Sequence, residues 1–119
     1  MASDETHAVL HTVSAEDGTP RRHRIWFVLD RSALDRTSVY VFSGGRREPA
    51  WLTNLRARPG GEVTIGGETW RYAARIDVLD EAERDRALGL LRAKYRGRTR
   101  STMTSLRGRG VLVALDLTP

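Results

Sequence analysis

The chain has 119 residues, a length that leaves room for one domain with one modest hydrophobic core. It contains no cysteine, which excludes disulfides, thiol nucleophiles and cysteine-ligated metal sites. The net charge is +5, and residues 96–109 carry five arginines and no carboxylate, which accounts for the excess. No apolar run has the length of a membrane span and the opening residues are acidic, unlike a secretory leader, so we expect a cytoplasmic protein.

Six segments predict β-strands because they are rich in apolar, β-branched and aromatic residues. In chain order they are Ala8–Ser14, Arg24–Asp30, Ser38–Phe42, Glu62–Ile65, Glu68–Val78 and Gly110–Leu117. Turn residues at 17–20 predict a hairpin between the first two strands, and Gly66-Gly67 predicts a tight turn between the fourth and the fifth. Short strands joined by hairpins favour an antiparallel barrel or sandwich over a doubly wound parallel sheet.

Two helices interrupt the predicted strands. The first spans Pro49–Arg58, because proline suits a helix start and Pro59 stops the helix. The second begins at the acidic cap Asp80 and ends at Gly97. Its apolar stripe consists of Leu88, Leu91 and Tyr95, so we interpret Tyr95 as a core residue. We interpret the carboxylates at its start, Glu81, Glu83 and Asp85, as a solvated first turn.

The segment from Ser43 to Asn54 joins a strand end to a helix start through paired glycines and paired arginines. Glycines let backbone N–H groups approach a ligand closely, and a helix N-terminus adds partial positive charge. Guanidinium groups add fork-shaped donors for phosphate or carboxylate. These features are typical of an anion-binding cradle, and a solvated surface loop is the alternative interpretation.

The same segment resembles the deazaflavin-dependent nitroreductase family, which belongs with the pyridoxamine-phosphate-oxidase-like FMN proteins to the split-barrel group. The resemblance rests on the glycine pair, on Pro49-Ala50-Trp51, and on Asn54-Leu55 followed by an Ala-x-Pro helix end. It continues through residues 62–71, 90–95 and 113–119. The resemblance implies a mainly β fold with two helices, a six-stranded antiparallel split β-barrel of the FMN-binding type. Residues 8–119 would form this single domain after a disordered tail at 1–7.

The resemblance also implies an oxidoreductase that binds the deazaflavin coenzyme F-420 (hereafter F420), with FMN as the alternative cofactor. Such an enzyme transfers hydride to a small organic acceptor, namely a quinone, a nitro compound or an activated alkene. Ser43 is expected nearest to the hydride-transfer centre, and the arginines are expected at the phosphate and the acidic tail. The implied cofactor-binding residues are Arg22, Arg24, Trp26, Ser43, Gly44, Gly45, Arg46, Arg47, Pro49, Trp51 and Asn54.

The first predicted hairpin departs from the family pattern Thr-Thr-Gly-Arg-x-Ser-Gly, because Glu16 and Asp17 stand where a cation is expected. Carboxylates at this place would repel a phosphate. The arginines that follow closely, and that compensate in our interpretation, are Arg21, Arg22 and Arg24. A relative that has kept the fold and lost the cofactor is the alternative.

The arginine-rich segment 96–109 supports a rival hypothesis, a non-catalytic protein that binds nucleic acid or another anionic partner. The segment lacks the interleaved aromatic residues of single-strand binders, so we favour the redox hypothesis over nucleic-acid binding. The histidines His7, His11 and His23 have no organised carboxylate partners, and we predict no metal site. Either a monomer or a homodimer fits the resemblance.

Overall fold

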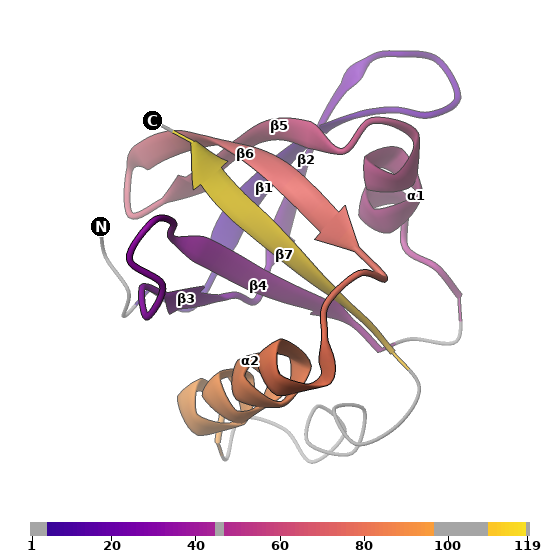
Figure 1. The fold of residues 1–119 in the computed structure, drawn as a ribbon. Helices are drawn as coiled ribbons and strands as arrows, with labels where there is room; N and C mark the ends of the chain where they lie inside the picture. The colour runs from indigo at the N-terminus through magenta and orange to yellow at the C-terminus, as the bar shows by residue number, and fades with distance from the viewer. Residues whose placement is uncertain (1–4, 45–46, 97–109, 119) are drawn as a thin grey trace.

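The computed structural model describes residues 5–44, 47–96 and 110–118. Within these ranges the chain forms one antiparallel sheet that curls into a half-barrel, with two helices packed against it (Figure 1). The elements are β1 (Ala8–Val13), β2 (Pro20–Ile25), β3 (Val28–Asp30), β4 (Ser38–Ser43), α1 (Ala50–Ala57), β5 (Gly60–Ile65), β6 (Glu68–Ile76), α2 (Glu81–Lys94) and β7 (Val111–Thr118). The strand order is β2-β1-β5-β6-β7-β4-β3, so β2 and β3 are the two edges.

The predicted split barrel with two helices is confirmed, but the sheet has seven strands and not six. The predicted strand Arg24–Asp30 is divided, because β2 pairs with β1 whereas β3 pairs with β4. Between the two strands, the Tyr95 hydroxyl accepts a hydrogen bond from the N–H of Phe27 at 2.8 Å and lies 2.9 Å from the Phe27 carbonyl oxygen. A side chain therefore satisfies the backbone where the chain changes its strand partner.

Both predicted hairpins are confirmed. In the first, Ala8 lies opposite Ile25 and Val13 opposite Pro20. In the second, Gly66 and Gly67 have φ angles of 57° and 83°, the left-handed region that a tight turn between β5 and β6 requires.

Two apolar clusters lie on the two faces of the sheet. Alternate residues of β4 point to opposite faces, so that Val39 and Val41 join the inner cluster while Tyr40 joins the outer one. The helix α1 contributes three apolar side chains to the inner cluster: Trp51, Leu52 and Leu55. The helix α2 covers the outer face with Ala87, Leu88 and Leu91. Among the described residues no helix is long and apolar enough to cross a membrane.

The interpretation of Glu83 as part of a solvated helix start is wrong, because its side chain is buried. Two guanidinium nitrogens of Arg75 in β6 donate to the carboxylate at 2.7 and 2.6 Å, and the Tyr40 hydroxyl donates to it at 2.6 Å. Arg75 also donates to Asp116 of β7 at 2.6 Å. The hydrogen bonds from Arg75 lower the pKa of Glu83 to about 2 against the cost of burial.

A second ion pair extends the same network toward β3. Arg86 of α2 donates to Asp30 at 2.9 Å, and the Tyr40 hydroxyl lies 3.4 Å from the same carboxylate. Burial opposes ionisation of Asp30, but hydrogen bonds from Ser32 and Arg86 outweigh it and hold its pKa at about 2. The network thus fastens α2 to strands β3, β4, β6 and β7.

Candidate functional site

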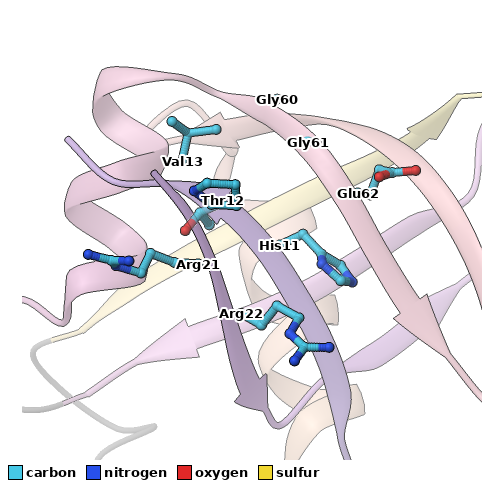
Figure 2. A pocket seen from close by; sticks show the side chains of 9 residues that line it. His11, Thr12, Val13, Arg21, Arg22, Gly60, Gly61 and Glu62 are labelled. Atoms are coloured by element: carbon cyan, nitrogen blue, oxygen red, sulfur yellow. The ribbon is translucent and has the colours of Figure 1, made fainter. Parts of the chain in front are cut away.

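Strand β2 presents its basic side chains on two opposite faces. Arg21 lies opposite the buried Thr12 of β1, whereas Arg22 lies opposite His11. Figure 2 shows Arg21 pointing toward α1, while Arg22 points to the other face, on the side of His11. By the two-residue period of a strand, Arg24 shares the face of Arg22. The arginines grouped together by sequence are therefore divided between two surfaces.

The outer face carries a hollow of about 380 Å³ near the first hairpin. Gly60 and Gly61 of β5 line it, and Arg22, His11 and Glu62 flank it (Figure 2). Glu62 and Arg22 both lie opposite His11, on β5 and β2 respectively. Within the described residues Arg22 has no ion-pair partner, so its guanidinium is available to a ligand.

An aromatic stack continues this face of the chain beyond β2. The rings of Trp26 and Tyr95 are parallel, with centroids 4.2 Å apart. The indole N–H of Trp26, the one polar group of the ring, donates to Nε2 of His7 at 3.1 Å. The stack and the hydrogen bond together hold Trp26, which is half-buried, in one orientation.

Arg24 lies beside this stack, 3.4 Å from Nδ1 of His7. Since Nε2 of His7 accepts the indole hydrogen, a neutral imidazole carries its own hydrogen on Nδ1 and has no lone pair there for Arg24. The guanidinium of Arg24 is therefore not neutralised by this contact. Arg22, Arg24 and Trp26 form an ordered row of two cations and one aromatic ring, which we call the β2 row.

The β4–α1 segment begins at Ser43, which pairs with Val111 of β7. Ser43 lies two residues after Val41, so its side chain is on the same inner face of the sheet. Gly44 follows, and the predicted site residues Gly45 and Arg46 lie outside the described residues. Arg47 is exposed and has no ion-pair partner among the residues that the structure describes.

The helix α1 begins after Pro49, which acts as the N-cap and offers no side-chain hydrogen bond to the first turn. Its N-terminal amides are therefore not satisfied by a capping side chain. The predicted helix start at this proline is confirmed to within one residue.

Asn54 docks α1 onto the first hairpin. Its Oδ1 accepts from the N–H of Ala15 at 2.9 Å, and its Nδ2 donates to Oγ1 of Thr12 at 3.0 Å. The same Oγ1 lies 3.0 Å from Nε2 of His23, whose pKa is lowered by burial and by Arg21. Trp51, one turn earlier in α1, is only 9% exposed and belongs to the inner core. The assignment of Asn54 and Trp51 to a cofactor stays a prediction.

The first hairpin neutralises one of its two unexpected carboxylates. Asp17 accepts from the hydroxyl and the N–H of Thr19 at 2.7 and 3.0 Å, and Arg21 donates to it at 3.3 Å. These hydrogen bonds, led by the Thr19 hydroxyl, lower the pKa of Asp17 to about 2. Arg21 compensates this charge, so Arg22 and Arg24 are left for an external anion. The arginine-rich segment 97–109, the basis of the rival hypothesis, lies outside the described residues.

The sequence alone did not reveal His7 and Tyr95 as supports of Trp26. They lie 19 and 69 positions from it along the chain, and only the fold brings them together. The other histidines serve as hydrogen-bond partners: His11 Nε2 lies 3.0 Å from Thr64 Oγ1 on the outer face, and His23 bonds Thr12. In the described ranges no cluster of three metal-ligating side chains occurs.

Solved structures with the same architecture cover nearly the whole chain. An F420-H2 dependent reductase (FDR-A) superposes with a TM-score of 0.73 at 18% identity, covering 93% of this chain and 94% of that one. A domain-swapped dimer matches with a TM-score of 0.73 at 19% identity, covering 94% and 81%. The conserved hypothetical protein Rv2991 from Mycobacterium tuberculosis gives 0.64 at 16% identity, covering 92% and 71%. These likenesses establish the split-barrel fold.

The family follows from the sequence itself. Residues 3–116 match the F420H(2)-dependent quinone reductase family, so the chain belongs to that family. It is therefore an oxidoreductase whose coenzyme is F420, which confirms the cofactor and the enzyme class predicted above. No curated protein sequence matches the chain.

The residues of the β2 row fit an anionic, planar coenzyme. Two guanidinium groups that have no carboxylate partner among the described residues suit a phosphate and an acidic tail, because each forms charge-assisted hydrogen bonds. The immobilised indole of Trp26 offers a flat surface to a ring system. The exposed Arg47 adds a third cation on the β4–α1 segment.

Proposed function

We propose that the protein transfers hydride from reduced F420 to a quinone, a nitro compound or an activated alkene. The proposed coenzyme site lies along the free edge of β2, between the β2 row and the β4–α1 segment. The observation that carries the proposal is the row itself. Two cations without a carboxylate partner in the described part of the chain, Arg22 and Arg24, lead along one face of an edge strand to the fixed indole of Trp26.

Bound F420 supplies the hydride, so the chain has to hold and orient it and to shield the reacting atoms from water. In the proposed site Arg22, Arg24 and the pair Arg46/Arg47 hold the phosphate and the acidic tail. Trp26 forms a wall for the ring and is kept in place by the stack with Tyr95.

The reacting end is assigned to the side of Ser43. Val28 lies opposite Tyr40, and continuing this register by two residues brings Trp26 next to Phe42. Trp26 and Phe42 both pack against the outer cluster. Ser43 is the next residue of β4, so its side chain turns to the opposite, inner face of the sheet. In the proposal its hydroxyl reaches the coenzyme from that face, at the end of the strand, and supplies a hydrogen bond to orient the ring or the acceptor. The remaining site residues act through their backbone or through packing: Gly44, Gly45, Pro49, Trp51 and Asn54.

The first test is a titration of the protein with F420 and with FMN, followed by tryptophan fluorescence. We expect saturable quenching by F420, and a smaller total quench in a Trp26→Phe variant that still binds. Oxidation of reduced F420 by a quinone, a nitroarene and an enone then ranks the acceptors. Absence of saturable binding by either coenzyme contradicts the proposal.

The Arg46→Ala/Arg47→Ala double variant tests the second wall of the site. Each charge-assisted hydrogen bond contributes about 1.5–3 kcal/mol, so F420 affinity should fall more than tenfold. Arg71→Ala is the matched control, because Arg71 is an exposed arginine on β6 outside the proposed site. Unchanged affinity in the double variant removes the β4–α1 segment from the site.

A further inference from the structure

The end of the barrel opposite α1 carries a hollow of about 680 Å³ that the coenzyme site does not use. The loop between β3 and β4, the turn between β5 and β6 and the end of β7 meet there, at the left of Figure 1. Trp70 and Leu117 supply apolar wall, and charged side chains surround them. The hollow adjoins Ser38 at the beginning of β4, whereas Ser43 ends that strand, so it lies away from the proposed reacting end.

An apolar side chain projects beside this hollow. Leu34, at the centre of the loop 31–37, has a relative exposure of 106% and therefore makes almost no contact with its own chain. The only other large apolar side chain so exposed in the described ranges is Val78, at 67%, which lies outside this surface. A projecting apolar side chain at the rim of an apolar hollow is self-complementary, because in a two-fold symmetric contact each copy can fill the hollow of the other.

The charges of the loop are also self-complementary. Arg31 and Asp35 are exposed, and neither forms an ion pair within the described residues. In a two-fold contact the same patch meets itself in reverse, so a pairing of Arg31 of one copy with Asp35 of the other occurs twice. Arg36 is already 3.7 Å from Glu83, so we leave it out of the contact.

The base of the loop is held rigidly enough to present these side chains. The N–H of Ser32 donates to Asp30 at 2.9 Å, and the N–H of Leu117 donates to the carbonyl of Thr37 at 2.9 Å. Both ends of the loop are therefore fixed to the sheet, which lowers the entropic cost of binding.

From these observations we infer that the β3–β4 loop is the contact surface of a symmetric homodimer. Leu34 of each copy inserts between Trp70 and Leu117 of the other, with Arg31–Asp35 pairs on both sides. The proposed contact has one inserted apolar side chain per copy and two ion pairs in all, so we expect the dimer to dissociate in the range of about 10–100 µM. Both proposed coenzyme sites stay open, since they lie at the other end of the barrel.

Sedimentation equilibrium or light scattering over a concentration series across this range tests the inference on the full-length chain. The wild type should shift from monomer to dimer, and Leu34→Asp should raise the dissociation constant at least about tenfold. Val78→Asp is the matched control and should dimerise like the wild type. Circular dichroism verifies that each variant is folded. A wild type that stays monomeric throughout, or a Leu34→Asp variant that dimerises normally, overturns the inference.

Charge exchange tests the symmetry of the contact. Arg31→Asp alone and Asp35→Arg alone each bring like charges together and should weaken self-association. A mixture of these two single variants should form heterodimers, because both cross-copy pairs are then of opposite sign. The Arg31→Asp/Asp35→Arg double variant should self-associate again. Failure of both the mixture and the double variant to associate overturns the proposed pairing.

Discussion

Arginines are used in two different ways on the two sides of this barrel. Around α2, Arg75 and Arg86 form ion pairs with carboxylates that belong to other elements of the same chain. On β2, Arg22 and Arg24 have no carboxylate partner in the described part of the chain. A guanidinium whose partners are internal stabilises the fold, and one whose partners are missing is ready for an external anion. The amino-acid composition cannot separate arginines that form internal ion pairs from arginines that bind a ligand, because it counts both kinds alike.

The largest effect is expected where the internal network is broken. Glu83→Ala removes the buried carboxylate that accepts two hydrogen bonds from Arg75 and one from the Tyr40 hydroxyl, and leaves Arg75 with Asp116 alone, so the free energy of unfolding should fall by about 3 kcal/mol. Urea denaturation measures this value. Glu81→Ala, two residues earlier and exposed on the same helix, is the control and should change it by less than about 0.5 kcal/mol. Equal effects in the two variants would show that the network does not stabilise the fold.

The fall of the unfolding free energy at acidic pH is a second test of the same network. Because the pKa of Glu83 is about 2 in the folded protein and its ordinary value is 4.5, its contribution is complete above 4.5 and is lost as the pH falls toward 2. The slope from this one carboxyl is at most about 1.4 kcal/mol per pH unit. A Glu83→Gln variant should lose this slope in denaturation curves taken between these pH values. A variant as acid-sensitive as the wild type would contradict the assignment.

Arg22 and Arg24 should affect coenzyme binding and leave the stability of the fold nearly unchanged. An Arg22→Ala/Arg24→Ala variant should lose about 2 kcal/mol of F420 binding, or about thirtyfold in affinity, with little change in unfolding free energy. Fluorescence titration and urea denaturation on the same preparation separate the two quantities. Loss of stability without loss of affinity would place these arginines with the internal network.

Asn54→Ala should fall between the two patterns, with a smaller effect. It removes two hydrogen bonds that join α1 to the first hairpin, and we expect a loss of about 1.5 kcal/mol in unfolding free energy. A Thr53→Ala control changes the neighbouring residue, whose hydroxyl bonds the exposed Glu48. If F420 affinity falls in Asn54→Ala and the unfolding free energy does not, Asn54 binds the coenzyme directly.

The smallest effect is expected for Tyr95→Phe. This change keeps the ring stack with Trp26 and removes only the hydroxyl, which bonds the backbone of Phe27 and the carbonyl of Thr6, at a cost of about 1 kcal/mol in unfolding free energy. Thermal denaturation detects a loss of this size. If the variant also loses F420 affinity, the position of Trp26 depends on the hydroxyl and not on the stack alone.

Local chemistry made much of the fold predictable. The Gly66-Gly67 turn depends only on backbone freedom, and the Asp80 cap depends on a side chain that reaches its own helix, accepting from the N–H of Glu83 at 2.8 Å. The break in the second predicted strand was not predictable in this way. It requires the Tyr95 hydroxyl, which comes from the far end of α2.

The burial of Glu83 did have a signal in the sequence. Glu83 precedes the buried Ala87 and Leu91 by one and two helical turns, so it lies on the stripe that faces the sheet. Our interpretation gave more weight to the charge of glutamate than to this helical spacing. The sequence did not reveal Arg75 as the partner of Glu83, because the pairing of β6 with β7 is what brings Arg75 next to the Glu83 carboxylate.

The site was predictable in its residue types and less so in its geometry. The predicted strand begins at Arg24 and therefore leaves Arg22 in a turn. The observed strand β2 begins at Pro20, so Arg22 and Arg24 both lie in it and share one face. The prediction also treated Arg21 as their equivalent, although the alternation of the strand turns it toward α1 and Asp17. The assignments on the β4–α1 segment await the binding experiments.

The position of β2 at the edge of the sheet has a consequence for the lifetime of the protein in solution. An edge strand exposes unpaired backbone groups that can recruit a strand from another molecule and start aggregation. Pro20 at its beginning and the charged side chains along it discourage such pairing. The arginines that we assign to the coenzyme therefore also keep the empty enzyme soluble, and replacing them with valine or isoleucine would favour fibrous assembly over a merely weaker enzyme.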